Sequence, residues 1–191
     1  MNPAVVIPVK SFTMAKGRLA DTLSPAERES LARDCATRVV RAAGDIAAFV
    51  VCGDPLVAEW ARALGARVVD QGRPGLDAAV ETGITAAAAA GHDHVIVAHA
   101  DLPLARSLAH VAVAGTVTIV TDRHHDGTNV LSFPLGAGFT TAYGPGSCDN
   151  HVRIAEQLGT PHRVLVDDEL SLDLDTADDL SELARRQGDT P

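Results

Sequence analysis

Three aspartates in this sequence have the residue type and the spacing to bind a divalent cation. Asp101 follows the apolar run "VIVA" and precedes Leu-Pro, which predicts a position at the end of a buried strand. Asp173 and Asp175 alternate with leucines in "LSLDLDT", the pattern of a half-buried strand. Carboxylates two positions apart on a strand lie about 6.6 Å apart and repel each other by roughly 2.5 kcal/mol at an effective dielectric of about 20. A shared cation such as Mg²⁺ would offset that repulsion; an Asp101 that caps a turn beside two solvated aspartates is the alternative.

Basic residues after the first expected strand form a second candidate. The segment "VKSFTMAKGRLAD" places Lys10, Lys16 and Arg18 in a loop around Gly17. Cations and loop amides in this position are typical of a grip on a nucleoside triphosphate. The segment lacks the P-loop glycine pattern, so a solvated basic loop is the alternative interpretation.

Two glycine-containing segments, "HDGTN" and "GPGS", lie beside expected strands. Their hydroxyls, on Thr128 and Ser147, and the amides around Gly127, Gly144 and Gly146 could bind a carboxylate or a phosphate. Ordinary turns would have much the same sequence.

Two other chemistries are not expected from the sequence. The eight histidines show no HExxH spacing and have no cysteine set beside them, so we do not expect a zinc site. There is no GxSxG elbow for a serine hydrolase either.

These residues must be positioned by elements in which strands and helices take turns. Helix starts are expected at Ser24-Pro25, at Asp54-Pro55, near Leu76 and at residue 151, and Thr176 with Asp179 predicts a capping box for a closing helix. Strands are expected at "AVVIPVK", "AAFVVCG", "ARVVD", "HVIVAHAD", "TVTIVTD", "NVLSF", "RVLV" and "LSLDL". The alternation predicts an α/β fold whose mainly parallel sheet is covered by helices on both faces. Such folds bind ligands at the carboxyl ends of the strands.

Length, charge and cysteine content narrow the class of protein. The 191 residues contain no linker, repeat or charge block, so we expect a single domain spanning residues 1–191. A net charge of −9, with 16 basic and 25 acidic residues, opposes nucleic-acid binding. Neither a long apolar run nor a signal-peptide layout is present, which predicts a protein without a membrane span. Three cysteines without CxxC spacing predict reduced thiols and a cytoplasmic location.

Seven segments, taken together and in order, resemble one known family. They are "IPVK", "AKGRL", "GLDAAV", "HADLP", "DGTNVL", "GPGSCDNH" and "LDLDTADDL", and they resemble the CofC/FbiD guanylyltransferases of deazaflavin coenzyme F-420 biosynthesis. The resemblance runs from residue 5 to about residue 183. It implies a nucleotide-diphospho-sugar transferase fold of the glycosyltransferase-A type, with GTP and Mg²⁺ as reactants and a three-carbon phosphoacid as acceptor.

The resemblance also implies roles for individual residues. By position, the metal set is Asp101, Asp173 and Asp175, and the acceptor-binding set is Thr128, Gly144 and Ser147. The phosphates of GTP would contact Lys10, Lys16 and Arg18, with Lys16 and Asp101 acting in catalysis. The acceptor phosphate would attack the α-phosphorus of GTP in line, so that positioning and electrostatics supply most of the catalysis.

Two positions depart from the family pattern. Asp77 stands in "GLDAAV" where the family usually has Asn, and Cys148 follows Ser147 where an aromatic is common. A carboxylate at Asp77 can accept hydrogen bonds from both N–H donors of guanine, so we keep Asp77 as a candidate reader of the base.

Among the three acceptors that the family uses, we expect phosphoenolpyruvate rather than 2-phospho-L-lactate or 3-phosphoglycerate. The expectation rests on the Ala/Arg/Asp-rich, Lys-poor composition, which is typical of high-GC bacteria. Family members from such bacteria more often resemble the branch that uses phosphoenolpyruvate. The product would pass to a downstream deazaflavin transferase. One rival is a molybdenum-cofactor or sugar-phosphate nucleotidyltransferase, although those usually carry an "LAGG"-type loop where this chain has "PVKSFTMAKGRL". A non-catalytic acidic module that binds Ca²⁺ and a protein partner is the alternative from a different class.

Overall fold

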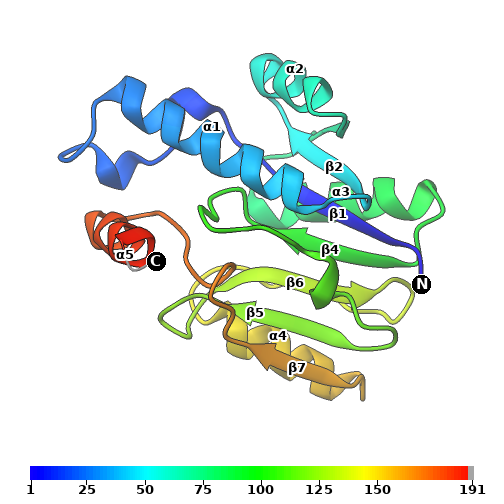
Figure 1. Ribbon diagram of the computed structural model, residues 1–191. Helices are drawn as coiled ribbons and strands as arrows, with labels where there is room; N and C mark the ends of the chain where they lie inside the picture. The colour runs from blue at the N-terminus through cyan, green and yellow to red at the C-terminus, as the bar shows by residue number, and fades with distance from the viewer. Residues whose placement is uncertain (189–191) are drawn as a thin grey trace.

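A seven-stranded mixed sheet forms the centre of the protein in the computed structural model, which describes residues 1–188 (Figure 1). The strand order is β3-β2-β1-β4-β6-β5-β7, and β6 runs antiparallel to its neighbours β4 and β5 while the other pairs are parallel. The mainly parallel sheet predicted from the sequence is therefore confirmed. The strands are β1 (Pro3–Pro8), β2 (Ala47–Cys52), β3 (Arg67–Asp70), β4 (His94–Ala98), β5 (Val117–Thr121), β6 (Thr128–Pro134) and β7 (His162–Leu165).

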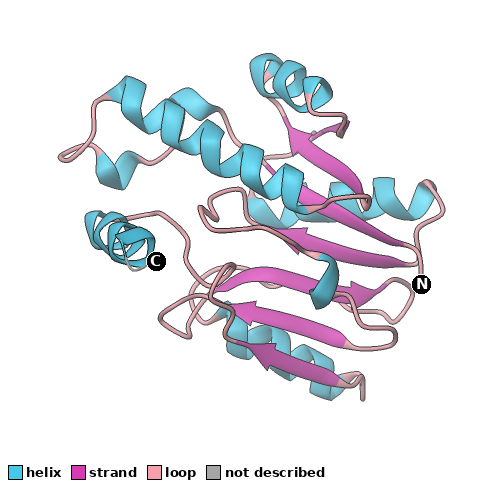
Figure 2. Ribbon diagram, in the orientation of Figure 1, coloured by secondary structure: helices cyan, strands magenta, loops and turns pink. Residues whose placement is uncertain are grey.

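Helices cover both faces of this sheet (Figure 2). One apolar cluster packs α1 and α2 against one face, and a second packs α3 and α4 against the other. The helices are α1 (Pro25–Ala42), α2 (Pro55–Ala63), α3 (Leu76–Ala89), α4 (Ser147–Gln157) and α5 (Ala177–Gly188), with short turns η1 (Phe12–Met14), η2 (Gly17–Leu19) and η3 (Ala109–Val111). None of the helices in residues 1–188 combines the length and the apolar character that a membrane crossing requires.

Both predicted capping boxes are present. The Ser24 hydroxyl accepts a hydrogen bond from the Glu27 amide, and the Glu27 carboxylate accepts one from the Ser24 amide at 2.8 Å. Asp179 and Thr176 repeat this exchange at the start of α5, with the Thr176 amide 2.7 Å from Asp179 Oδ2. These side chains satisfy N–H groups that the first turn of a helix leaves unpaired, so they fix where α1 and α5 begin.

Helix α3 lies unusually close to the sheet at Gly83. A Cβ atom at this position would be 2.4 Å from Val6 Cγ1 and 2.8 Å from Val51 Cγ2. Such distances are shorter than any carbon–carbon contact allows, so only glycine lets α3 settle onto β1 and β2. This packing sets the position of the first turn of α3, which reaches the carboxyl edge of the sheet.

Two element predictions were wrong. The segment 170–174 is not a strand, because its backbone bonds with loops and side chains instead of a ladder: Leu174 N donates to Asp101 O at 3.1 Å and Asn129 Nδ2 donates to Leu170 O at 3.0 Å. Its three leucines are nevertheless fully buried, as the alternation predicted. Helix α4 begins at Ser147 rather than at His151, because Gly146, with a φ of 68°, already turns the chain into the helix.

Candidate active site

The three predicted metal ligands lie together at the carboxyl edge of the sheet. Asp101 follows β4, while Asp173 and Asp175 lie in the segment that connects β7 to α5. One carboxylate oxygen from each lies within 4.8 Å of the other two. The bond from Leu174 N to Asp101 O joins the two segments, and Asp179 Oδ2 accepts the Asp175 amide at 3.0 Å. We call these three aspartates the carboxylate cluster.

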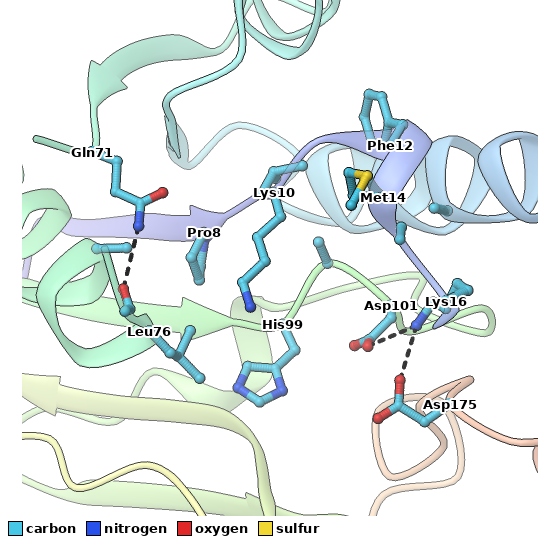
Figure 3. A pocket seen from close by; sticks show the side chains of 17 residues that line it. Pro8, Lys10, Phe12, Met14, Lys16, Gln71, Leu76, His99, Asp101 and Asp175 are labelled. Carbon is cyan, nitrogen blue, oxygen red and sulfur yellow. Dashed lines mark hydrogen bonds and ion pairs between the residues drawn. The ribbon is translucent and has the colours of Figure 1, made fainter. Parts of the chain in front are cut away.

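Lys16 inserts its ammonium group into the carboxylate cluster (Figure 3). Its Nζ atom donates to Asp101 Oδ2 at 2.9 Å and to Asp175 Oδ1 at 3.3 Å, and its side chain is only 6% exposed. The backbone of Lys16 is left-handed, with a φ of 58°, which is a costly conformation for a residue with a side chain. The loop after β1 is thus bent in the way that brings this ammonium to the cluster.

Electrostatic coupling within the cluster shifts the pKa values of its members. Burial disfavours the charged form of Lys16, but the neighbouring Asp101 and Asp175 outweigh it and raise the pKa of the ammonium. Burial disfavours the charged form of Asp101 as well, yet Lys16 holds the pKa of that carboxyl below its usual value. The pKa of Asp173 is raised, because burial and repulsion from Asp101 and Asp175 act in the same direction. The cluster therefore carries more negative charge than Lys16 neutralises.

The donor set of the cluster fits a hard divalent cation. Oδ1 of Asp101 is buried and has no hydrogen-bond partner among residues 1–188, an arrangement that is costly for a carboxylate oxygen. Oxygen atoms of carboxylates are the ligands that hard cations prefer. Asn129, on β6, donates to Asp173 Oδ1 at 3.4 Å and so orients this side chain. An ion among the three carboxylates would satisfy Asp101 Oδ1 and reduce the repulsion that raises the pKa of Asp173.

A pocket of about 450 Å³ opens beside the cluster. Its walls are the segment after β1, the first turn of α3 and residues 99–101. Figure 3 shows Lys16 and the carboxylates at one end, Gln71 and Leu76 at the other, and Lys10 and His99 between them. The pocket thus has charged groups at one end and an amide beside apolar side chains at the other, a combination that suits a ligand with an anionic part and a flat polar part.

The remaining predicted phosphate contacts are placed differently. Lys10 is exposed and lines the pocket, whereas Arg18 lies near the cluster, with Nη1 3.8 Å from Asp175 Oδ2. The Arg18 side chain is 78% exposed, so this ion pair leaves it free to move toward a ligand. Lys10 and Lys16 thus line the pocket from the loop predicted for them, and Arg18 lies beside the carboxylate cluster.

Asp77 is not among the residues that line the pocket. Its Oδ1 atom accepts hydrogen bonds from Thr141 Oγ1 at 3.0 Å and from the Tyr143 amide at 3.2 Å. Asp77 therefore fastens residues 141–147, which we call the glycine loop, to the start of α3. Its role as a reader of the guanine base stays a prediction.

The predicted acceptor-binding residues lie next to one another on β6, the glycine loop and α4. The Ser147 amide donates to Gly144 O at 3.1 Å, and Thr128 is connected to this region through His151, 3.0 Å from its Oγ1. The side chains of Thr128 and Ser147 are buried, and these residues are 1% and 2% exposed. Gly144, with a φ of 122°, is exposed. Their role in binding an acceptor stays a prediction.

Three further residues, Asn129, His99 and His151, were not predicted from the sequence. Asn129 follows Thr128 directly in a segment that we had singled out, so its position was the available signal. His99 lines the pocket two residues before Asp101, and its Nε2 atom is buried without a hydrogen-bond partner among residues 1–188. No spacing among the eight histidines distinguishes His99 or His151 from the others, so the sequence holds no local signal for either.

Comparisons with known proteins identify the family of this chain. Residues 3–190 match the family described as "Guanylyl transferase CofC like". The phosphoenolpyruvate guanylyltransferase of Rubrobacter xylanophilus is 35% identical over 98% of this chain and 96% of its own length. The 2-phospho-L-lactate guanylyltransferase of Methanothermobacter thermautotrophicus is 32% identical over 96% of this chain and 87% of its own length.

The fold is also found among solved structures. A structure from Desulfovibrio desulfuricans, assigned to the nucleotide-diphospho-sugar transferases, superposes with a TM-score of 0.75 at 16% identity and covers 99% of this chain and 89% of its own. At this identity the likeness concerns the fold alone. The fold class predicted from the sequence is confirmed.

Proposed function

The chain belongs to the family of CofC-like guanylyl transferases, and from that premise we propose that it transfers GMP from GTP to the phosphate of phosphoenolpyruvate. The products are an enolpyruvoyl diphosphoguanosine and pyrophosphate. The observation that carries the proposal is the carboxylate cluster with Lys16 at one end of a pocket large enough for a nucleotide. The relative from Rubrobacter xylanophilus, named for phosphoenolpyruvate, supports this acceptor.

Positioning of two anions is the main task of the side chains in this mechanism. Lys10, Lys16 and Arg18 would hold the triphosphate of GTP, and the glycine loop with Thr128 and Ser147 would hold the acceptor. Bound substrates aligned in this way convert a bimolecular encounter into an intramolecular one. An acceptor phosphate is ionised near neutral pH, so no side chain has to remove a proton from it.

Mg²⁺ is the cation that we propose for the carboxylate cluster, with Asp101, Asp173 and Asp175 as its ligands. When bound, it supplies positive charge that neutralises phosphate oxygens. The Lys16 ammonium lines the pocket where a phosphate would lie. Its positive charge, which pairs with Asp101 and Asp175 in the ligand-free protein, would also stabilise the phosphates of GTP during transfer.

The cellular setting is also part of the proposal. Cys35, Cys52 and Cys148 are all buried and unpaired, which supports a reducing, cytoplasmic compartment. A guanylylated phosphoacid is an activated intermediate, so a transferase that consumes it, here a deazaflavin transferase of coenzyme F-420 biosynthesis, is the expected partner.

Nucleotide choice tests the base end of the pocket. We expect GTP to be preferred over ATP, because groups paired with guanine donors are left unmatched by adenine. If Asp77 reads the base, the substitution Asp77→Ala should lower the ratio of kcat/KM for GTP to kcat/KM for ATP. An unchanged ratio would remove Asp77 from this role and leave the Gln71 and Gly75 end of the pocket to read guanine.

Competition among acceptors tests the substrate. Equal concentrations of phosphoenolpyruvate, 2-phospho-L-lactate and 3-phosphoglycerate are incubated with GTP, Mg²⁺ and the protein, and the products are weighed by mass spectrometry. We expect the enolpyruvoyl product to dominate. Because the acids differ by about one small packing interaction, or roughly 1–3 kcal/mol, the discrimination is expected to be about fivefold to 150-fold. A dominant lactyl product would match the relative from Methanothermobacter thermautotrophicus and overturn the choice of acceptor.

A further inference from the structure

A buried histidine joins the two segments that the proposed function assigns to the acceptor. His151, on α4, is completely buried. Its Nδ1 atom lies 3.0 Å from Thr128 Oγ1 on β6, and its Nε2 atom lies 3.0 Å from the amide nitrogen of Ala142 in the glycine loop. One imidazole ring thus bridges the start of β6 and the glycine loop.

Hydrogen-bond chemistry fixes the form of this ring. The Ala142 amide can only donate, so Nε2 of His151 must be the accepting nitrogen. In a neutral imidazole the other nitrogen then carries the proton, and Nδ1 donates to Thr128 Oγ1. A second proton would turn Nε2 into a donor facing another donor, and the bond to Ala142 would be lost.

The surroundings of the ring favour this neutral form. Titratable groups face it from three directions: Asp77 on α3, His99 after β4 and Tyr143 of the glycine loop, whose ring packs edge-on at 5.1 Å. Burial is the largest influence on the pKa of His151; Asp77 opposes it and His99 adds to it, and together they lower the pKa to about 4. The ring is therefore neutral throughout the physiological range while the loop is in place.

We propose that His151 is a positioning residue that, as a neutral imidazole, holds the glycine loop against β6 in the geometry that binds the acceptor. This inference rests on the proposed function, since it assigns His151 to the acceptor side of that same site. Asp77 binds the same loop at Thr141 and Tyr143, on either side of Ala142, so the loop has two separate attachments, one to Asp77 and one to His151. Loss of His151 should loosen the loop without touching the nucleotide pocket, which His151 does not line.

A pH dependence follows from the two states of the loop. A released loop would expose His151 and return its pKa toward 6.5, whereas the held loop keeps it at about 4. The released form binds more protons between these values, so the equilibrium between held and released loop shifts by up to about tenfold per pH unit as pH falls. The affinity for the acceptor should weaken in this acidic range, and the affinity for the nucleotide should decrease much less over the same range.

Three variants separate the two hydrogen bonds from general destabilisation. The substitution His151→Leu removes both bonds, and His151→Gln keeps a group that accepts from Ala142 but cannot be protonated in this range. His162→Leu, at the exposed start of β7, is the matched control. The sequence contains one tyrosine, so fluorotyrosine labelling gives a single fluorine NMR resonance that reports on Tyr143 in the loop.

We expect His151→Leu to raise the acceptor KM about tenfold or more, with the GTP KM within about threefold of wild type. The fluorine resonance should be displaced in this variant, and in the wild type it should move the same way as pH falls from 6.5 toward 4. His151→Gln should restore acceptor KM to within about threefold and abolish the pH-dependent movement.

Two results would overturn the inference: a wild-type acceptor KM in His151→Leu, or a His151→Gln variant with the defects of His151→Leu. If His151→Leu fails to fold, His151→Gln and the titration of the wild type decide the question. Failure of the proposed function is distinguishable, because the wild type would then transfer no GMP while the fluorine resonance still reports whether His151 holds the loop.

Discussion

The balance of charge at the carboxylate cluster determines what single substitutions should do. Asp173 repels Asp101 and Asp175 and lies in a partly buried position, which is why its pKa is raised. Lys16 donates hydrogen bonds to Asp101 and Asp175, whereas Asp173 accepts its hydrogen bond from Asn129. The members of the cluster are therefore unequal: Asp173 opposes the stability of the ligand-free protein, and Lys16 supports it.

The substitution Asp173→Asn should separate activity from stability. We expect GMP transfer to fall by about a hundredfold or more, because one proposed metal ligand is lost. The free energy of unfolding should stay the same or rise by up to about 1 kcal/mol, since a like charge is removed. Asp168→Asn, an exposed site in the same segment, is the control. Urea unfolding and initial rates at limiting Mg²⁺ measure both quantities, and near wild-type turnover in Asp173→Asn would refute the assignment.

The substitution Lys16→Met should lower the stability of the ligand-free protein, in contrast to Asp173→Asn. Without the ammonium, Asp101 loses its charge partner, so we expect the free energy of unfolding to fall by about 2 kcal/mol in the absence of Mg²⁺. The decrease is smaller than for a fully buried pair because the aspartate is partly exposed. Added Mg²⁺ should recover part of this loss. Thermal unfolding with and without Mg²⁺ measures the effect, with Lys10→Met, an exposed lysine of the same loop, as the control. Equal unfolding temperatures for Lys16→Met and Lys10→Met would show that Lys16 does not stabilise the cluster.

At the scale of elements, local signals in the sequence predicted most of what the structure contains. Ser24 and Thr176 carry complete capping boxes, so both helix starts were predictable from four-residue patterns. The alternation at 170–174 predicted which leucines are buried but not that the segment lacks a ladder. Alternation reports which side chains face a core, whereas pairing depends on which neighbour is free, and that is a tertiary property.

The contact between α3 and the sheet gives a test at the same scale. The substitution Gly83→Ala should destabilise the protein by about 1–3 kcal/mol, because the added methyl would overlap Val6 and Val51, despite the better helix propensity of alanine. Gly53→Ala, where a Cβ meets nothing within 4 Å, should change stability by less than about 0.5 kcal/mol. Chemical unfolding compares the two, and equal stabilities would show that α3 does not press on the sheet at Gly83.

Assembly of the site depends on the whole molecule. Asp101 and Asp175 are far apart in sequence, yet the ends of β4 and β7 lie at the same edge of one sheet. Residue type and spacing made these aspartates one candidate set, but the expected strand at 170–174 is absent, and the bond from Leu174 N to Asp101 O joins the two segments. The bridges made by Asn129 and His151 could not be predicted, because they join β6 to other segments through contacts that no local pattern encodes.

The most direct test of the central claim follows the phosphorus atoms of GTP. Wild-type protein is incubated with GTP, Mg²⁺ and phosphoenolpyruvate, and phosphorus NMR monitors the reaction beside an Asp101→Asn control. We predict a new diphosphate that joins GMP to the acceptor, one pyrophosphate for each product molecule, and no product with Asp101→Asn. Unchanged GTP, or conversion of GTP to GDP and orthophosphate, would contradict guanylyl transfer at this site.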